Sequence, residues 1–208
     1  MYLFNRTRQA KSNALLEATA GAVEIAAQVT QLTGLEIHVW TYRFGEPVGT
    51  MMWSARLESQ SQLFEATEKM TADQGYIDKA MALAELYEGP AVDGMFRVVS
   101  GTPTNAPSRF IQTTLATMSN GKYAEAVAFG VDMQQFIAAE RSQPTIFGTA
   151  TYGGFADVGW IVGADSMAEV DEGDAWQATN ADYHAKVHSA AGLFVEGSGR
   201  QNLLEKLN

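Results

Sequence analysis

The amino-acid sequence predicts an α+β fold in which one βαββαβ unit occurs twice and the two copies form a pseudo-dimeric α/β barrel. The same order of strand and helix signals occurs on both sides of the segment 101–108, and similar residues recur 107 positions apart. That segment, "GTPTNAPS", carries two prolines and small polar residues, which break both periodicities. We therefore expect a first repeat at 1–100, a linker at 101–108 and a second repeat at 109–208.

The first repeat opens with the strand "YLFNRTRQ" and continues through Ser12, the expected N-cap, into a helix that ends at Gly34. Residues 35–44 alternate as in a strand, and after a turn at "GEP" the segment "VGTMMWSARL" predicts a second strand. A helical region from Ser59 to Tyr87 and the strand "GMFRVVS" follow. The predicted order is βαββαβ.

The second repeat shows the same order. The strand "RFIQTTLAT" precedes a helix that carries Phe129, Met133 and Phe136. The strands "TIFGTATY" and "ADVGWIVGA" come next, then a helical region from Ser166 to Phe194 and a final strand near "NLLEKL". At the offset of 107, the matches include Thr7 with Thr114, Trp53 with Trp160, Ser59 with Ser166, and Tyr76 with Tyr183.

Each βαββαβ copy is a ferredoxin-like unit, in which both helices cover one face of an antiparallel sheet. The other face is left bare and would expose a large apolar patch to water. Two copies remove this patch when they pack bare face to bare face, with the helices outside. This packing is the reason for expecting a barrel.

The composition excludes several classes of partner. The chain has 24 acidic and 14 basic residues and a formal charge of -10, so it should repel nucleic acids and anionic membranes. It has no cysteine, which excludes disulfides and Cys-ligated metals. No apolar run approaches the roughly 20 residues of a membrane span. We expect a soluble, cytoplasmic protein with neither a nucleic-acid nor a membrane partner.

The stretch "EIHVWTYRF", residues 36–44, places two kinds of side chain on opposite faces of one strand. Ile37 and Val39 suit a face covered by helices. His38, Trp40 and Tyr42 would then point into the barrel. Period-2 alternation separates the faces without labelling them, so the opposite orientation stays open.

The equivalent strand of the second repeat has smaller residues. Counterparts of the His-Trp-Tyr row are expected at about Ile146, Gly148 and Ala150, if the turn differs by one residue. Such an interior would hold an apolar or aromatic ligand, with His38 and Tyr42 as polar contacts. Alternatively, the aromatic rings simply fill the space that glycine and alanine leave.

His38 is the candidate base. A neutral imidazole near pH 7 would take a proton from a phenol-like substrate, the step that activates electron-rich compounds for oxygen without a cofactor.

Four segments carry a resemblance to a known family: the strand ends "WSARLES" and "WIVGADS" and the helical stretches "DQGYIDKA" and "NADYHAKV". Together with the duplication, they resemble the dimeric α/β-barrel superfamily. It includes antibiotic-biosynthesis monooxygenases, NIPSNAP-type proteins, chlorite-dismutase-like proteins and haem-degrading monooxygenases. The resemblance implies that two subunits of the usual dimer are fused here. It also implies a homo-oligomer.

The haem-degrading branch has an Asn on the first strand, a Trp on the third and a His on the following helix. In the first repeat Asn5 and Trp53 match, but Ile77 and Met81 stand where the His would be needed.

In the second repeat Trp160 accompanies His184 and His188, but Gln112 stands in place of the Asn. The triad is thus split between the repeats. His184 or His188 would be the ligand of a haem. No metal site is expected, because a third ligand to join these two histidines is not evident.

The favoured function is binding of a small apolar or aromatic ligand in the barrel. Whether the protein is an enzyme stays open; as an enzyme it would be a cofactor-independent monooxygenase or an isomerase. The alternatives are a non-catalytic oligomeric assembly protein and a haem-binding or haem-degrading barrel. The expected site has His38 and Tyr42 as catalytic residues and, as ligand-binding residues, Asn5, Trp40, Trp53, Gly148 and Trp160.

Overall fold

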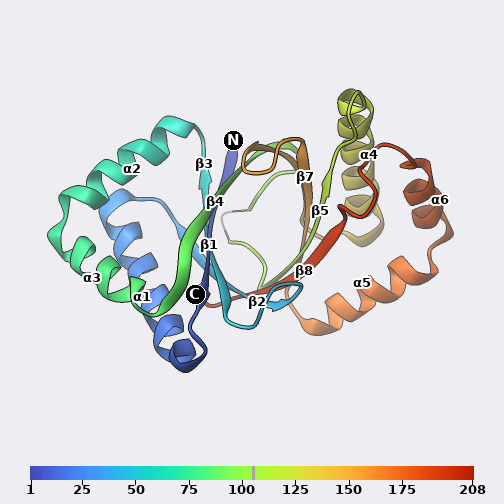
Figure 1. The fold of residues 1–208 in the computed structure, drawn as a ribbon. Helices are drawn as coiled ribbons and strands as arrows, with labels where there is room; N and C mark the ends of the chain where they lie inside the picture. Colours follow the sequence, from blue (N-terminus) through green and yellow to red (C-terminus); the bar gives the residue numbers. More distant parts are fainter. Residues whose placement is uncertain (105) are drawn as a thin grey trace. The chain divides into compact units, whose positions relative to one another are not determined.

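A computed structural model describes residues 1–104 and 106–208. Within these residues the chain has an α+β fold whose eight antiparallel strands follow one another in the closed order β1-β3-β2-β8-β5-β7-β6-β4 (Figure 1). In both repeats the fourth strand neighbours the first, the first neighbours the third, and the third neighbours the second. This common order confirms the predicted fold class.

The first repeat contains a short 3-10 helix, Ser12–Ala14, and three α-helices between its strands. Its elements are β1 (Tyr2–Ala10), α1 (Leu15–Thr33), β2 (Ile37–Phe44), β3 (Thr50–Leu57), α2 (Gln60–Ala72), α3 (Gln74–Ala84) and β4 (Tyr87–Ser100).

The second repeat follows the same order. Its elements are β5 (Phe110–Thr117), α4 (Tyr123–Arg141), β6 (Thr145–Tyr152), β7 (Asp157–Ala164), α5 (Met167–Thr179), α6 (Ala181–Ser189) and β8 (Arg200–Lys206). No helix in the described part of the chain is both long and apolar enough to span a bilayer.

The chain divides into two compact units, which we call unit 1 and unit 2. Unit 1 comprises Met1–Met95 and Glu205–Asn208, and unit 2 comprises Phe96–Leu204. The units therefore differ from the sequence repeats at the last strand of each repeat. The last five residues of β4, from Phe96 on, belong to unit 2, and the last four residues of the chain belong to unit 1.

Backbone and side-chain hydrogen bonds fix the C-terminus in unit 1. The Leu207 amide donates to the Val39 carbonyl at 2.8 Å, and the Asn208 amide group donates to the Ile37 carbonyl at 2.8 Å. The end of the chain thus lies alongside β2 and is hydrogen-bonded to its backbone.

The register of the strands corrects the repeat alignment. Trp53 and Trp160 are 107 positions apart, but Val39 and Phe147, which lie opposite them on β2 and β6, are 108 apart. The first strands also follow the offset of 108. Asn5 therefore corresponds to Thr113 and not to Gln112.

The same register shows that Thr7 corresponds to Leu115 and not to Thr114. It confirms Ile146 and Gly148 as the counterparts of His38 and Trp40.

The two ends of α1 differ in how well they were predicted. Gly34 is left-handed, with φ 78°, and its amide donates to the Thr30 carbonyl at 2.9 Å, which confirms the helix stop. Ser12 is not the N-cap. The chain instead closes a 3-10 turn, in which the Ala14 amide donates to the Lys11 carbonyl, before α1 begins.

Each long helical region is split in two by a side-chain cap. The Asp73 carboxylate accepts from the Tyr76 amide at 2.6 Å and starts α3. The Asn180 side chain accepts from the Tyr183 amide at 2.7 Å and starts α6. In both places a short polar side chain satisfies an amide that the helix itself leaves unpaired.

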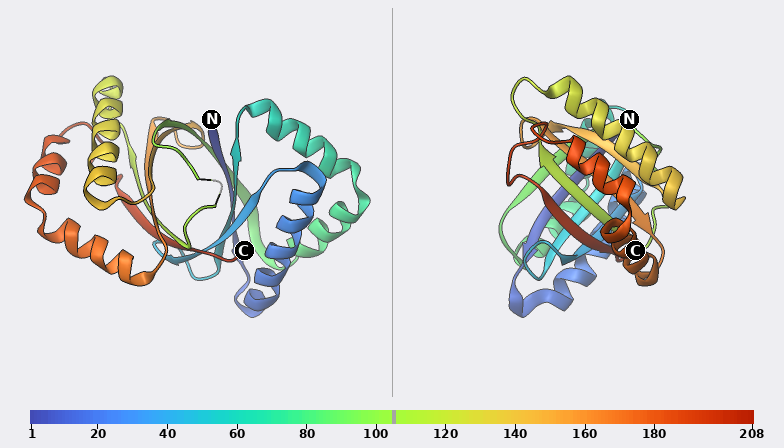
Figure 2. Two further views of the ribbon diagram at one scale, coloured as in Figure 1. Left: turned by 180° about the vertical axis from the view of Figure 1, so that it is seen from behind. Right: turned by 90° about the vertical axis from the view of Figure 1, so that its right-hand side faces the viewer.

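In each unit the helices lie on one side of its strands, as two further views show (Figure 2). In unit 1, α1 contributes mainly alanines to the core, including Ala18 and Ala22, which pack against Val39 and Met51. In unit 2 the corresponding core contains Phe147, which is fully buried. The β2, β3, β6 and β7 residues in these two clusters all come from the faces that the helices cover.

Candidate functional site

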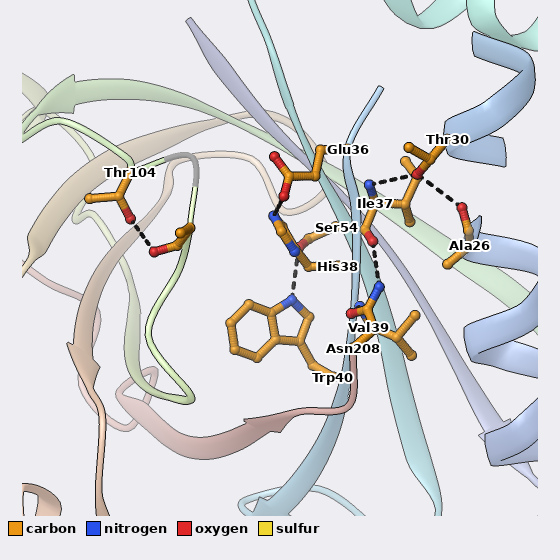
Figure 3. Close-up of polar contacts among 11 residues, drawn as sticks. Ala26, Thr30, Glu36, Ile37, His38, Val39, Trp40, Ser54, Thr104 and Asn208 are labelled. Carbon is orange, nitrogen blue, oxygen red and sulfur yellow. Dashed lines mark hydrogen bonds and ion pairs between the residues drawn. The ribbon is translucent and has the colours of Figure 1, made fainter. Parts of the chain in front are cut away.

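The alternating stretch of β2 separates two environments in unit 1. Ile37 and Val39 belong to the core that α1 covers, and the Ile37 amide donates to the Thr30 hydroxyl of that helix. His38 and Trp40 project from the other side of β2, as Figure 3 shows. The expected assignment of aliphatic residues to the helix-covered face is confirmed.

On this second face, three polar side chains form a row across three strands. His38 on β2 lies opposite Ser54 on β3, and Ser54 lies opposite Asn5 on β1. The indole Nε1 of Trp40 donates to the Ser54 Oγ at 2.8 Å (Figure 3). We call Asn5, His38, Trp40 and Ser54 the His38 cluster.

The imidazole of His38 is held in a neutral state. Its side chain is 17% exposed, and burial lowers the pKa of His38 below its ordinary value of 6.5. Glu36, whose Oε1 lies 3.8 Å from Nε2, acts in the opposite direction, and Lys206 adds to the lowering. Near pH 7 the ring therefore has one lone pair that can accept a proton.

Trp40 supplies the apolar wall of the cluster. It is 3% exposed, and its ring lies edge-on to His38 with the centroids 6.4 Å apart. Because its N–H is satisfied by Ser54, the indole plane is fixed in one orientation. An aromatic ring of fixed orientation thus lies beside the imidazole of His38.

Tyr42 continues the same face of β2 toward the hairpin. Its hydroxyl contacts the sulfur of Met52 at 3.8 Å, a weak hydrogen bond. The structure thus keeps Tyr42 on the side of His38 and Trp40, but directs its hydroxyl to a methionine.

Asn5 borders the cluster on the side of β4. A Cβ at Gly94 would lie 2.8 Å from the Asn5 Oδ1, so β4 passes close to this amide. In the described part of the chain the Asn5 side chain has no hydrogen-bond partner, so it can still bind a polar ligand atom.

Trp53 and Trp160, expected among the ligand-binding residues, lie on the faces that the helices cover. The Trp53 indole donates to the Ala22 carbonyl at 3.2 Å, and the Trp160 indole donates to the Gly130 carbonyl at 3.0 Å. Trp160 is 7% exposed and packs in a core cluster with Phe147. The structure separates both tryptophans from the face that carries Asn5 and Trp40.

Gly148 does not leave open room in unit 2. It is buried, and a Cβ there would lie 2.9 Å from the Arg97 carbonyl oxygen and 3.6 Å from the Cβ of Phe96. The absence of a side chain instead permits the close approach of β4. The room expected at Gly148 is therefore taken by the backbone of β4 at Arg97.

The triad of the haem-degrading branch is not assembled in either unit. Asn5 and Trp53 belong to opposite faces of one sheet, since Trp53 pairs with Arg6. Trp160 is packed between β7 and α4. The space beside these tryptophans is filled by side chains, so the residues do not fit a haem there.

The two helical histidines are exposed on α6. His184 Nε2 lies 2.8 Å from the Gln177 carbonyl oxygen, so this nitrogen is engaged within the helix pair. Among residues 1–104 and 106–208, no group of three His, Cys, Asp or Glu side chains is placed to hold a metal ion. His184 and His188 therefore lack the partners that a metal centre requires.

Ser54 and Glu36 were not predicted as site residues. The period-2 pattern of β3 does place Ser54 on one face with Met52. Its position between Asn5 and His38, however, depends on the register between strands, which the sequence of one strand does not contain.

No protein-family model matches the sequence, and no curated protein matches it. Solved structures do match. A candidate monooxygenase of Fusobacterium nucleatum subsp. nucleatum superposes with a TM-score of 0.73 at 9% identity, over 100% of this chain and 92% of the other. A candidate monooxygenase of Lactobacillus acidophilus gives 0.67 at 9% identity, over 99% and 93%.

An anthrone oxidase-like protein also superposes, with a TM-score of 0.67 at 13% identity, over 100% of this chain and 91% of the other. At these identities the likeness concerns the fold. The chain has the fold of the dimeric α/β-barrel superfamily, with both halves of the barrel in one polypeptide.

Proposed function

We propose that this protein binds an electron-rich aromatic compound at the His38 cluster and that His38 removes a proton from it, so that oxygen reacts without a cofactor. The observation that carries the proposal is a neutral, mostly buried imidazole set edge-on to a buried indole. A base of this kind suits a weakly acidic C–H or O–H group held against an aromatic wall.

Each residue of the His38 cluster, and Glu36 beside it, has a distinct task. Glu36 on the Nε2 side of His38 favours the tautomer with its proton on Nε2, which leaves Nδ1 as the base. Trp40 stacks against the ligand, and Ser54 keeps the indole in place. The unpaired Asn5 amide donates to a ligand oxygen on which negative charge develops.

An anthrone, in which a CH₂ group lies between two rings and opposite a ketone, illustrates the step. His38 takes one CH₂ proton, and the carbanion transfers one electron to O₂ to give superoxide and a carbon radical. These combine into a peroxide, which takes the proton back from His38 and loses water to leave a second ketone. The balance is anthrone plus O₂ to anthraquinone plus water, and no external reductant is consumed.

The comparisons support this choice of substrate class at the level of the fold. Two of the similar structures are candidate monooxygenases and a third is anthrone oxidase-like. The anthrone is therefore the first compound to test.

The test measures oxygen uptake and anthraquinone formation with 1,8-dihydroxyanthrone as the probe. Wild type should exceed the rate in buffer, and His38→Gln should lose about 100-fold or more, the usual contribution of a general base. His188→Gln is the control, because it removes an exposed histidine of the same chemistry. Its rate should equal that of the wild type.

The pH dependence is a further readout. Since the pKa of His38 lies below 6.5, the rate should fall only when the pH drops below that value. A wild-type rate no greater than that in buffer would contradict the proposal and favour a non-catalytic binding or assembly protein. An equal loss in His188→Gln would contradict the assignment to His38.

A further inference from the structure

The backbone on either side of His38 is held by the side chain of Asn208, the second residue after β8 (Figure 3). The Asn208 Nδ2 donates to the Ile37 carbonyl at 2.8 Å, and its Oδ1 accepts from the Val39 amide at 2.8 Å. One side-chain amide thus binds an acceptor and a donor of β2, as the backbone of a neighbouring strand would. The Leu207 amide, which donates to the Val39 carbonyl, brings Asn208 to this place.

Val39, one of the two residues held by Asn208, is fully buried, with 0% exposure. An amide at such a position has no water to replace a lost acceptor, and leaving it unpaired is costly. The Ile37 carbonyl would lose its donor at the same time. Removal of the Asn208 amide therefore favours a shift of β2 at residues 37–39 that brings these groups to other partners.

Unit 2 holds the corresponding carbonyl with a different residue. Thr145 corresponds to Ile37, and its carbonyl accepts from the Nε2 of Gln134 on α4 at 2.9 Å. Gln134 is 5% exposed, and the helix alignment places Ala26 at its counterpart on α1, where the side chain has no donor. This carbonyl therefore has a side-chain amide partner in both units, from a helix in unit 2 and from Asn208 in unit 1.

The place of the His38 imidazole depends on this part of the backbone. His38 lies between the two residues that Asn208 holds, and its ring is set edge-on to Trp40. The indole of Trp40 is fixed separately, by its bond to Ser54 on β3. A shift of β2 would therefore change the position of the imidazole relative to the indole. For a base that must reach one proton of a bound ligand, a displacement of about 1 Å costs up to about 100-fold in rate.

We propose that Asn208 is a positioning residue for His38, whose side-chain amide fixes the main chain of β2 so that the imidazole meets the acidic group of the ligand. This inference rests on the proposed function of His38 as a base. Asn208 acts through the backbone. Glu36 and Lys206, the charged groups that influence the pKa of His38, keep their charges when Asn208 is changed.

The test combines NMR of the His38 ring with the rate of 1,8-dihydroxyanthrone oxidation in Asn208→Ala. Without the amide the ring gains contact with water, so the pKa of His38 should rise toward 6.5, because burial is the main cause of its lowering. The kcat should fall about 10-fold through misplacement of the base. The KM should stay within about two-fold of the wild-type value, because Trp40 and Ser54 still bind the ligand.

Two variants serve as controls. Gln134→Leu removes the equivalent carbonyl bond in unit 2, where Ile146 stands in place of His38. It should lower the urea midpoint but leave the His38 signal and the kcat unchanged. Asn208→Gln keeps an amide, and because residue 208 is exposed the longer side chain has room to reach β2. It should retain most of the wild-type kcat and keep the pKa of His38 below 6.5.

An unchanged His38 signal in Asn208→Ala would overturn the proposal. So would a changed signal with an unchanged kcat in an active enzyme, or equal effects in Gln134→Leu, which would indicate a general loss of stability. A wild type that does not oxidise the anthrone would contradict the proposed function instead. The NMR comparison then still decides whether Asn208 positions the imidazole, because it needs no turnover. Urea unfolding of each variant verifies that the fold is retained.

Discussion

In units 1 and 2 the first long helix packs on the same strands of the sheet, but with different residues at the contact. In both, the tryptophan of the third strand donates to a carbonyl in the middle of the first long helix. Unit 1 places Ala22 on the helix above Val39, whereas unit 2 places Gly130 above Phe147. A larger strand residue is matched by a smaller helix residue, so the summed volume is retained.

The opposite faces differ in chemistry instead of volume. The row of side chains across the first three strands is polar in unit 1 and mainly apolar in unit 2. The corresponding pairs are Asn5 and Thr113, Ser54 and Ile161, and His38 and Ile146. The comparison indicates that the fold constrains the helix-covered face of both units, and that among the three positions compared on the other face only unit 1 has an acid–base group, His38.

The largest effect is expected at Gly130. Alanine there should destabilise the protein by about 1–3 kcal/mol through overpacking, because its methyl group would overlap the fully buried Phe147 ring. The penalty outweighs the better helix propensity of alanine. Urea unfolding of Gly130→Ala, Phe147→Val and the double variant measures it.

The double variant has the residue pair of unit 1, so it should be more stable than the sum of the two single changes predicts. Strict additivity would contradict the compensation between helix and strand. Val39→Phe in unit 1 is the matched change and should destabilise through the same overlap, this time with Ala22.

A smaller effect is expected from the two tryptophan hydrogen bonds. Trp53→Phe and Trp160→Phe each remove an indole donor from a helix carbonyl, which is worth about 1 kcal/mol in addition to the lost ring volume. Trp160→Phe should cost more, because Trp160 is 7% exposed and packs against three other rings. A larger loss in Trp53→Phe, measured by thermal unfolding, would reverse this ranking.

The helix caps should give effects of opposite sign in the two units. Ser142→Gly relieves a left-handed conformation and should stabilise by about 0.5–1 kcal/mol, whereas Gly34→Ala should destabilise by about 1 kcal/mol. Chemical unfolding of both variants tests this. A destabilised Ser142→Gly would show that the serine side chain supports the turn more than its conformation strains it.

The smallest expected effect is the pH dependence due to His38. Its pKa is lowered in the folded state, so the unfolded chain binds more protons as the pH falls below about 6.5. Folding stability should therefore decrease on acidification through 6.5 and stop changing, for this group, below the folded pKa. The urea midpoint of wild type minus that of His38→Gln, between pH 5 and pH 7.5, isolates this contribution.

The sequence predicted the fold because its signals are local. Period-2 alternation in 36–44 and the stop at Gly34 each depend on a few neighbouring residues, and their repetition indicated the duplication. The 3-10 turn at Ser12 was missed, because the serine that suits an N-cap also suits a tight turn.

The site was harder to predict because it depends on register and on distant packing. The pairing of Ser54 with His38 is set by the hairpin between β2 and β3. The space at Gly148 is taken by the backbone carbonyl of Arg97, 51 positions earlier in the chain.

The most direct test of the central claim, that His38 is the acid–base group of the site, is side-chain NMR of the histidines. The chain has three, and His184 and His188 on the exposed face of α6 serve as internal references, with His38→Gln to assign the signals. The account predicts that the His38 signal titrates below pH 6.5. It also predicts that adding 1,8-dihydroxyanthrone without oxygen shifts the His38 signal saturably and leaves the signals of His184 and His188 where they are. A His38 signal that ignores the probe, or that titrates at or above 6.5, would contradict it.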